Sequence, residues 1–518
     1  MSKEYTREEV AKHNTPDDLW VIIDHGVYNL SKFAKFHPGG KYVLTAVAGK
    51  DATAEFYGQH REEVLHGMGK KFLIGKVAGE TLPSPPVPGT LSKVPFAESS
   101  AWLGFKTPYF KESHFRVRDA MRKFMDTEIA PDCHQLDDAG EEPSLEIYQK
   151  MGRAGILSTR VGPGPHLKML EKLGVPVIGG VPADEFDYFH EMIVHEEISA
   201  IGTPGYTDGL GAGLVIGLPP VLHFGKPEVA MKCAKEVLLG DKRICLAISE
   251  PTAGSDVASL VTVAEKTPCG QFYIVNGIKK WITNGSFADY FVTAVRTGGT
   301  GMGGISLLLI ERGEGLTTKK IKTSYSPSAG TAHVFYDNVK VPVGNLLGKE
   351  NKGFQCIMSN FNHERWMIIC GVVRCNRLII EECFKWANQR KVFGKPLMQQ
   401  PVIREKLAKM VAANESVHNW TENITYQMNN MNLKEQAVHL AGPIALLKYQ
   451  TTRVSNLIID EACQIFGGRA ITRTGMGKVI EKFQRATKFG AILGGSEEIM
   501  ADLGIRQSMR AMPPHARL

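Results

Sequence analysis

The sequence lacks the features that place a chain in a membrane or in a disulfide scaffold. No apolar run reaches the roughly 20 residues needed to cross a bilayer, and the opening segment "MSKEYTREEV" has no apolar signal-peptide region. The nine cysteines are scattered after residue 100 without a CxxC pair, so we expect free thiols in a reducing compartment. The 61 basic and 54 acidic residues form no long run of one sign, which argues against a nucleic-acid surface.

What is present predicts several domains. A chain of 518 residues with 43% hydrophobic content exceeds the usual size of one domain. Five prolines between residues 79 and 95 indicate a linker. Helical patterns, then short β-rich runs, then long helical patterns follow it. We therefore expect a multidomain α+β protein with a small domain at 1–78, a linker at 79–99, a helical domain at 100–240, a β domain at 241–345 and a helical bundle at 346–518.

One glycine pattern invites a wrong assignment. Gly299-x-Gly301-x-x-Gly304 fits the dinucleotide-binding pattern. That function requires a helix directly after the glycines, whereas a strand-like run follows them here. We predict a turn between two strands.

The stretch "NFNHERW", residues 360–366, places a carboxylate where an apolar side chain is expected. It lies in a helical pattern from about Gly353 to Ala387. No cation lies three or four positions from Glu364, so a helical salt bridge does not explain it. The apolar stripe that includes Glu364 is formed by Phe354, Ile357, Met358, Phe361, Ile368 and Val372. Burial should raise the pKa of such a carboxyl group, which suggests a functional role.

The small domain contains "HPGG" at residues 37–40, then "AGKDAT", a phenylalanine and His60. Two histidines on separate short helices with apolar walls suit the axial ligation of a haem iron. The segment 4–78 resembles cytochrome b5, and the resemblance implies that His37 and His60 are the axial ligands of haem b. One residue fewer than in microsomal members separates the phenylalanine from His60, so His66 stays a competing ligand.

Four further motifs stand in order in the large remainder. They are "LAISEPTAGSD" from Leu246, "WITNG" from Trp281, "RKVFGKPL" from Arg390 and "QIFGG" from Gln464. Together with a fifth motif near residue 494, they make residues 100–512 resemble an acyl-CoA dehydrogenase. The resemblance implies a helical domain, a central β domain and a carboxy-terminal four-helix bundle, with FAD as cofactor and a homo-oligomer, usually a tetramer.

Site residues follow from the resemblance where the motifs match. It assigns Ser255 and Arg365 to coenzyme A. Pro401 stands where the family often has a glutamine that contacts the flavin, which puts that contact in question. The positions implied to contact FAD are Leu246, Ile248, Ser249, Ser255, Trp281, Thr283, Arg390, Phe393, Gln464, Gly467, Gly468, Ser496 and Glu498.

The family reaction needs a carboxylate that removes a proton next to a thioester carbonyl, and donors on the carbonyl oxygen. Most members carry this base just before a Gly-Ser or Gly-Thr pair, where this chain has Gly494. In isovaleryl-CoA and long-chain acyl-CoA dehydrogenases the base is a glutamate before an arginine on a bundle helix, which Glu364-Arg365 matches. We therefore predict Glu364 as the base and the Gly494 N–H as a donor, with Glu497 as the competing base.

The resemblance implies that an acyl-CoA becomes a trans-2-enoyl-CoA, with Glu364 taking the α proton and FAD the β hydride. We expect the electrons to pass to the fused haem and then to an unidentified acceptor. The alternatives are an oxidase-like enzyme that uses O₂ and a non-catalytic flavin-binding protein. The terminus Ala516-Arg517-Leu518 resembles a peroxisomal signal. The small residues of 202–220 either widen an acyl pocket or serve helix packing.

Overall fold

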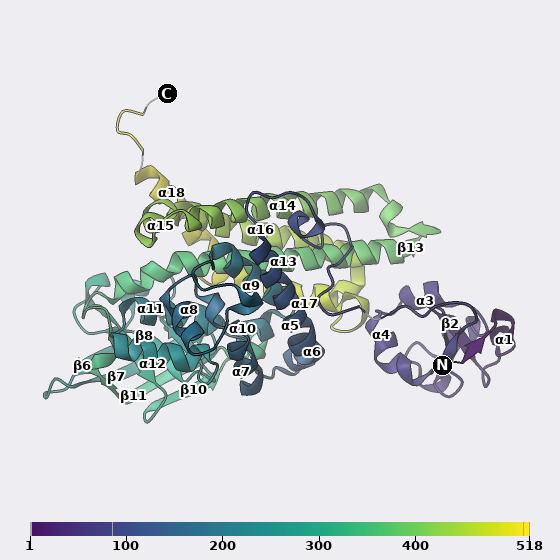
Figure 1. The fold of residues 1–518 in the computed structure, drawn as a ribbon, viewed down its shortest axis with the longest axis horizontal. Helices are drawn as coiled ribbons and strands as arrows, with labels where there is room; N and C mark the ends of the chain where they lie inside the picture. The colour runs from purple at the N-terminus through teal and green to yellow at the C-terminus, as the bar shows by residue number, and fades with distance from the viewer. Residues whose placement is uncertain (1–2, 85, 511, 517–518) are drawn as a thin grey trace. The chain divides into compact units, whose positions relative to one another are not determined.

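The computed structural model describes residues 3–84, 86–510 and 512–516 (Figure 1). The chain forms two compact units, which are described separately. Unit 1 comprises Met1–Thr90, Glu382–Leu407 and Ala462–Glu481, and unit 2 comprises Leu91–Glu381, Ala408–Glu461 and Lys482–Leu518. In the described part of the chain, no helix combines the length and apolar content that a bilayer crossing requires.

Unit 1 contains a four-stranded sheet in the order β1-β4-β3-β2. Strand β2 buries both faces, because Val21 and Ile23 join one apolar cluster and Ile22 joins another. The elements of this small domain are β1 (Glu4–Tyr5), α1 (Arg7–Ala11), β2 (Trp20–Ile23), β3 (Gly26–Asn29), α2 (Lys41–Ala46), α3 (Thr53–Tyr57), α4 (Glu63–His66) and β4 (Leu73–Val77). The hairpin of β13 (Lys391–Val392) and β14 (Lys395–Pro396) also belongs to unit 1.

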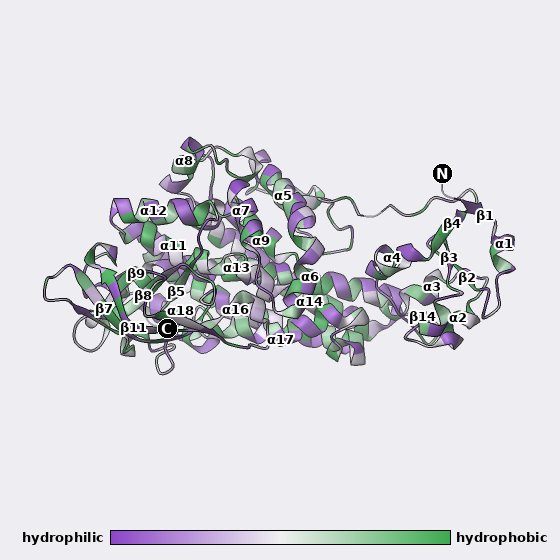
Figure 2. Cartoon of the chain, turned by 90° about the horizontal axis from the view of Figure 1, so that it is seen from below, coloured by the Kyte–Doolittle hydropathy of each residue, from purple (hydrophilic) through white to green (hydrophobic). Residues whose placement is uncertain are grey.

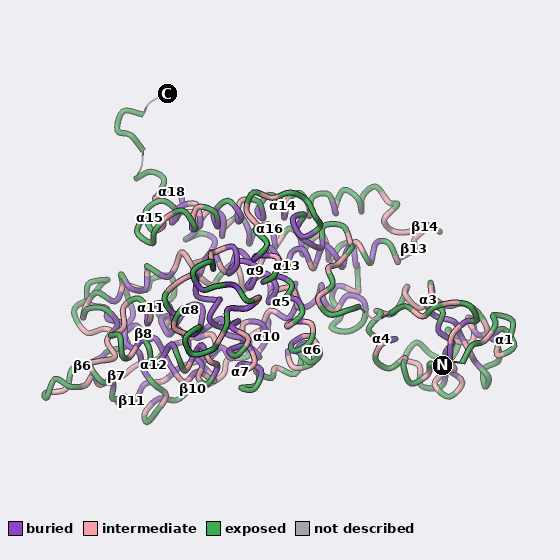
Figure 3. Tube along the Cα trace, viewed as in Figure 1, coloured by how far each residue is buried: buried purple, intermediate pink, exposed green. Residues whose placement is uncertain are grey.

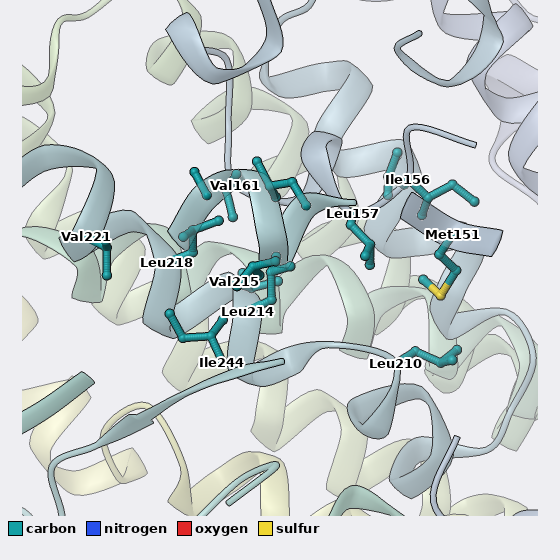
Figure 4. Packing of buried hydrophobic residues seen from close by; sticks show 14 of the residues in the cluster. Met151, Ile156, Leu157, Val161, Leu210, Leu214, Val215, Leu218, Val221 and Ile244 are labelled. Atoms are coloured by element: carbon teal, nitrogen blue, oxygen red, sulfur yellow. The ribbon is translucent and has the colours of Figure 1, made fainter. Parts of the chain in front are cut away.

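Unit 2 begins with the predicted helices. They are α5 (Glu112–Phe124), α6 (Ala130–Ala139), α7 (Leu145–Arg153), α8 (Pro165–Lys172), α9 (Tyr188–Ser199), α10 (Pro204–Gly209), α11 (Ala212–Phe224) and α12 (Pro227–Leu238). Helix α11 presents Leu214, Val215, Leu218 and Val221 to a core shared with Ile244 of the first β strand of this unit (Figure 4).

The central β domain is an eight-stranded sheet in the order β10-β11-β7-β6-β8-β9-β12, with β5 parallel to β8. The strands are β5 (Ile244–Ala247), β6 (Val263–Lys266), β7 (Phe272–Ile282), β8 (Tyr290–Arg296), β9 (Ile305–Glu311), β10 (Leu316–Lys320), β11 (Ala332–Pro342) and β12 (Leu346–Leu347). The Gly299–Gly304 segment connects the antiparallel strands β8 and β9, which confirms the predicted turn.

Long helices form the third part. They are α13 (Gly353–Gln389), α14 (Pro401–Asn429) and α16 (Ala441–Phe466), joined by the shorter α15 (Leu433–His439), α17 (Lys478–Ile492) and α18 (Glu497–Arg510). Figure 1 shows α13, α14 and α16 running alongside one another. Buried Trp366 of α13 donates from Nε1 to Thr425 Oγ1 of α14 at 2.9 Å. The bundle helices mix hydrophilic and hydrophobic residues (Figure 2), with buried positions on the sides that face other helices (Figure 3). The predicted fold class is confirmed.

The end of the predicted linker is fixed to unit 2 by a buried charge network. Arg122 of α5 donates to both carboxylate oxygens of Glu98, at 2.8 and 3.1 Å, and also to Glu197 of α9. Arg374 of α13 donates to the Ala97 carbonyl at 3.1 Å. These bonds anchor the linker end, because a buried carboxylate is stable only when paired.

We expect Arg122→Leu to destabilise unit 2 by about 3–5 kcal/mol, since it leaves two buried carboxylates without their shared cation. The matched control is Arg116→Leu on the same helix, where the partner Glu112 lies 3.8 Å away and the pair is exposed. That change should cost under about 1 kcal/mol. Thermal unfolding midpoints of the two variants measure the difference, and equal midpoints would contradict the assigned role.

Candidate functional site

Glu364 lies on α13 with its side chain turned into the protein. The residue is 8% exposed, and its Oε2 accepts no hydrogen bond from any residue that the structure describes. Burial raises the pKa of Glu364 to about 7, against the opposing influence of Arg365, Lys448 and His363. The carboxyl group therefore exchanges a proton near neutral pH, as its place on the apolar stripe suggested.

The carboxylate of Glu364 reaches the loop that follows α17. A Cβ atom built on Gly494 would lie 3.5 Å from Glu364 Oε1 and 2.7 Å from Ile368 Cδ1. Gly494 has a φ of +62°, a conformation that side-chain-bearing residues rarely adopt. Glu364 thus brings a carboxylate close to where a side chain at position 494 would start.

Glu497, the competing base, has a different environment. It is the first residue of α18, and its Oε2 lies 3.6 Å from Arg453 of α16. Glu497 is also buried, and its Oε1 accepts no hydrogen bond from the described residues, so the cation near Oε2 is what distinguishes it from Glu364. The geometry supports Glu364 over Glu497.

Two cations contact the loop at residues 493–495. Arg365 is 7% exposed, stacks over Phe361 and donates from Nε to the Gly494 carbonyl at 3.2 Å. The fully buried Lys448 of α16 donates to the Leu493 and Gly495 carbonyls. The contact of Arg365 with coenzyme A stays a prediction. Sequence reasoning missed Lys448, although a lysine inside the apolar run "PIALLKY" was a detectable signal.

A second buried acid, Glu191, is hydrogen-bonded to His363, the residue before Glu364. Glu191 Oε1 of α9 accepts from His363 Nε2 at 2.8 Å and from His195 Nε2 at 3.3 Å. Burial by itself lowers the pKa of His363, but the adjacent Glu191 outweighs it and the net shift is upward. His363 is therefore a neighbour of Glu364 whose protonated form is favoured by Glu191, which the sequence pattern did not reveal.

The predicted flavin-lining residues of the β domain are held by one buried ion pair. Lys279 Nζ donates to Glu250 Oε1 at 2.7 Å and to the Ile248 carbonyl at 3.0 Å, and the Lys280 N–H donates to the Ser249 carbonyl. These bonds connect the segment at 246–250 to the end of β7. Leu246 and Ile248 are buried there, while Ser249 is half-buried.

Trp281, near the end of β7, has an unusual backbone conformation. Its φ is +66°, and its indole is 55% exposed. Asn284 fixes the turn, because its side chain accepts from the Gly213 N–H at 2.7 Å and donates to the Ala329 carbonyl at 2.9 Å. A strained, exposed aromatic on a rigid turn fits contact with a planar ring such as a flavin. Thr283 beside it is half-buried.

The remaining predicted contacts of unit 2 lie at the surface or in the loop. Ser255 is exposed in the turn after β5. Ser496 precedes α18, and Glu498 lies in its first turn, where the backbone and the Ser496 side chain lower the Glu498 pKa.

The other predicted FAD positions belong to unit 1. Arg390 follows α13, and Phe393 is 94% exposed with a φ of +51°. Gln464, Gly467 and Gly468 are exposed at the end of α16 and directly after it.

Arg469 adds a cation that the motif did not include. Its guanidinium stacks over Trp386 at 5.0 Å, and burial together with the nearby charge of Arg390 lowers its pKa. Two neighbouring cations beside open glycine backbone fit the diphosphate of FAD. Pro401 is the first residue of α14, a position that suits proline, since its missing N–H has no helical partner there.

The two predicted haem ligands approach one another in unit 1. The ring centroids of His37 and His60 are 5.9 Å apart. Nδ1 of His37 donates to the Gly40 carbonyl, and Nδ1 of His60 donates to the Phe56 carbonyl. These bonds place the ring proton on Nδ1, so each Nε2 keeps a lone pair for iron. Nε2 of His66 instead pairs with Glu62 at 3.1 Å, which favours His60 as the second ligand.

Apolar side chains surround these rings. Phe33, Leu44, Val47 and Phe56 pack partly against the core of the small domain, and Phe36, Val43 and Leu73 are exposed. The Phe56 ring stacks on His60 at 4.7 Å. Two free imidazole nitrogens inside an apolar rim fit a haem with both axial positions filled.

Arg61, the residue after His60, joins an ion pair within unit 1. It donates to both oxygens of Glu382, from Nη1 at 2.5 Å and from Nη2 at 3.0 Å, and to the Met476 carbonyl. Lys478 also pairs with Glu63. His60 and Arg61 lie in the segment between α3 and α4, and not on a helix as the sequence suggested; complementary charge links this segment to the end of α13.

A cluster of His114, Asp187 and His190 resembles a metal site but serves helix capping. His114 Nδ1 accepts from the Lys111 N–H at 2.8 Å, and its Nε2 donates to Asp187 at 3.0 Å. The Asp187 side chain caps the first turn of α9. A protonated ring nitrogen cannot bind a metal.

The small residues at 202–220 are explained by packing. A Cβ on Gly213 would lie 2.5 Å from the Ile244 carbonyl oxygen, and one on Gly217 would lie 3.0 Å from Cys245. These glycines allow α11 to approach β5 closely, so they leave no added room for an acyl chain at these points.

Comparisons with known proteins agree with this arrangement. Models of the acyl-CoA dehydrogenase N-terminal, middle and C-terminal domains match residues 111–241, 245–339 and 351–509, and the cytochrome b5-like heme/steroid binding domain matches residues 6–78.

Individual relatives cover most of the chain. The acyl-CoA dehydrogenase apdG of Emericella nidulans is 39% identical over 422 residues, which are 81% of this chain and 96% of that protein. The mitochondrial long-chain specific acyl-CoA dehydrogenase of Mus musculus is 28% identical over 77% of this chain and 87% of its own. A structure of an acyl-CoA dehydrogenase complexed with FAD from Bacillus anthracis has a TM-score of 0.67 at 25% identity, covering 79% of this chain and 69% of that one. The chain carries a cytochrome b5-like domain, which implies haem. Its remainder belongs to the acyl-CoA dehydrogenase family, whose members are oxidoreductases with FAD as cofactor.

Proposed function

We propose that this enzyme oxidises an acyl-CoA thioester to the trans-2-enoyl-CoA, with Glu364 as the base that removes the α proton. The observation that carries this assignment is the position of the Glu364 carboxylate, buried and 3.5 Å from the Cβ site of Gly494. FAD, when bound, supplies the acceptor for the β hydride.

The environment of Glu364 suits proton removal. The group is buried, and a pKa of about 7 keeps a useful fraction of the carboxylate ionised near neutral pH while making it basic enough to accept a proton. The Gly494 N–H is the donor for the thioester oxygen, where negative charge grows as the proton leaves.

We also propose that the haem domain receives the electrons removed from the substrate. Two protein ligands on the iron favour electron transfer over oxygen binding. Unit 1 contains His37 and His60 together with the FAD-diphosphate candidates Arg390 and Gly467, and the Arg61–Glu382 pair links the two regions. The final acceptor is a further redox partner that takes electrons from the haem.

Oligomer formation and peroxisomal location complete the proposal. Phe393, an exposed aromatic in a strained conformation, supports a site completed by a second copy of the chain. The Ala516-Arg517-Leu518 terminus supports import into peroxisomes. Arg517 and Leu518 lie outside the described residues.

We expect Glu364→Gln to abolish flavin bleaching by acyl-CoA while FAD stays bound, because the amide cannot accept the α proton. In the wild-type enzyme the bleaching rate should rise between about pH 6 and about pH 8, as Glu364 loses its proton and becomes an active base. Anaerobic stopped-flow absorbance with a panel of acyl-CoA chain lengths measures both effects and identifies the substrate class.

Two further variants sharpen that test. Glu497→Gln should leave bleaching intact, and its loss would move the base to Glu497. The double variant Glu364→Gly with Gly494→Glu should recover part of the activity, because the new carboxylate starts close to the space that Glu364 occupies. Recovery will be incomplete, since a side chain at 494 must shift Ile368 and adopt a positive φ.

For the haem, we expect His37→Ala and His60→Ala each to remove the bis-histidine absorbance spectrum, because each takes one axial ligand from the iron. His66→Ala is the matched control and should retain the spectrum. Loss in His66→Ala with retention in His60→Ala would exchange the two assignments.

We expect haem reduction to follow flavin bleaching when acyl-CoA is added without oxygen. Arg61→Glu should slow haem reduction by roughly tenfold without slowing bleaching, because it places two carboxylates face to face. The double variant Arg61→Glu with Glu382→Arg should restore the rate, with the haem spectrum as a control. A flavin that bleaches while the haem stays oxidised would refute the electron route, and peroxide formed in air at one per turnover would indicate an oxidase.

A further inference from the structure

The loop after α17 is held by three charge-assisted hydrogen bonds to consecutive carbonyls. Lys448 Nζ donates to the Leu493 oxygen at 2.7 Å and to the Gly495 oxygen at 2.6 Å. Arg365 Nε donates to the Gly494 oxygen between them at 3.2 Å. Such bonds are stronger than those between neutral groups, so they define the direction of each peptide.

The first of these bonds determines where the Gly494 N–H points. In a trans peptide the carbonyl of one residue and the N–H of the next are coplanar and point in opposite directions. Because Lys448 holds the Leu493 carbonyl on one side, the Gly494 N–H is directed to the other side. Gly494 and Gly495 have φ values of +62° and +102°, so the loop has little intrinsic preference for this shape and depends on the cations.

Burying the ammonium group of Lys448 costs free energy. It is fully buried on α16, and burial together with Arg365 lowers its pKa to about 8, while Glu364 and Glu497 favour its charged form. An ammonium group in the interior is tolerated only where strong acceptors replace its water. Here the acceptors are the carbonyls of the loop that adjoins the base.

We propose that Lys448 is a positioning residue for the dehydrogenation, which aims the Gly494 N–H at the thioester oxygen and keeps the loop at 493–495 aligned with Glu364. This inference rests on the function proposed above. Lys448 touches neither the substrate nor the flavin in this role; it acts through the peptide between Leu493 and Gly494.

The polarisation of a bound thioester tests the proposal directly. The probe is an enoyl-CoA labelled with ¹³C at the carbonyl, bound to the full-length holoenzyme, and the measurement is its infrared carbonyl stretch. In the wild-type enzyme the N–H should shift this band to lower frequency. In Lys448→Met the shift should shrink, and the limiting rate of flavin bleaching should fall by about 10- to 100-fold with a smaller change in KM.

Conservative and control variants separate positioning from folding. Lys448→Arg and Lys448→Gln keep donors for the loop and should retain part of the carbonyl shift, which also secures the test if Lys448→Met loses FAD. Arg453→Met changes a largely exposed cation on the same helix and should leave the shift unchanged.

Two outcomes distinguish this proposal from the proposed function. If the carbonyl shift in a folded, FAD-loaded Lys448→Met or Lys448→Gln equals that of the wild type, the positioning role is wrong, even where the rate falls. If no acyl-CoA bleaches the wild-type flavin, the proposed dehydrogenation fails, while the band of the bound enoyl-CoA still reports on Lys448.

Discussion

The site depends on a carboxylate that is buried without a hydrogen-bonded cation. Glu364 is stable in this position because much of its population near neutral pH is protonated, which avoids the cost of a buried charge. The same property suits Glu364 to the proposed role of base, because a carboxylate that gains by accepting a proton removes one from a substrate more readily. Surrounding groups moderate this effect: Arg365, Lys448 and His363 each favour the ionised form, and together they keep the pKa close to neutrality.

Because the proposed base Glu364 lies on helix α13, the loop at 493–495 does not supply it. Helix α13 is fixed to α14 through Trp366 and to α11 through Asn360, whose side chain donates to the Ile216 carbonyl at 3.0 Å. The base is therefore held by packed helices. Gly494 has no side chain, so in the proposed reaction the loop contributes only the direction of a backbone N–H. A glycine-containing loop keeps an N–H in one direction only when other groups hold its peptides. Lys448 and Arg365 do so here by donating to the loop carbonyls.

Helical periodicity and motif spacing predicted the features that depend on residues close together in sequence. Helical periodicity located α13 and the inward side of Glu364, and motif spacing located the histidines that approach in the small domain. Lys448 was missed because its partners lie some 45 positions away in sequence, at Leu493 and Gly495. Arg469 was missed for a similar reason, since its relation to Arg390 depends on the close approach of two helix ends. The glycines at 213 and 217 had two readings from sequence, and only the contact with β5 distinguished them. Unit 1 combines distant segments of the chain, because residues 382–407 and 462–481 group with the amino-terminal residues.

The fused haem domain addresses a constraint set by the chemistry of the flavin site. Dehydrogenation removes two electrons at once, whereas a haem iron accepts one at a time. In the proposed electron route, covalent linkage would keep the second carrier at high effective concentration, so that electron removal would not depend on diffusion of a separate protein. The length of the Pro-rich segment before residue 91 limits how far the haem domain can extend from unit 2. The Glu98–Arg122 network anchors the end of the linker. The ion pair of Arg61 and Glu382 lies within the same compact unit as the two histidines.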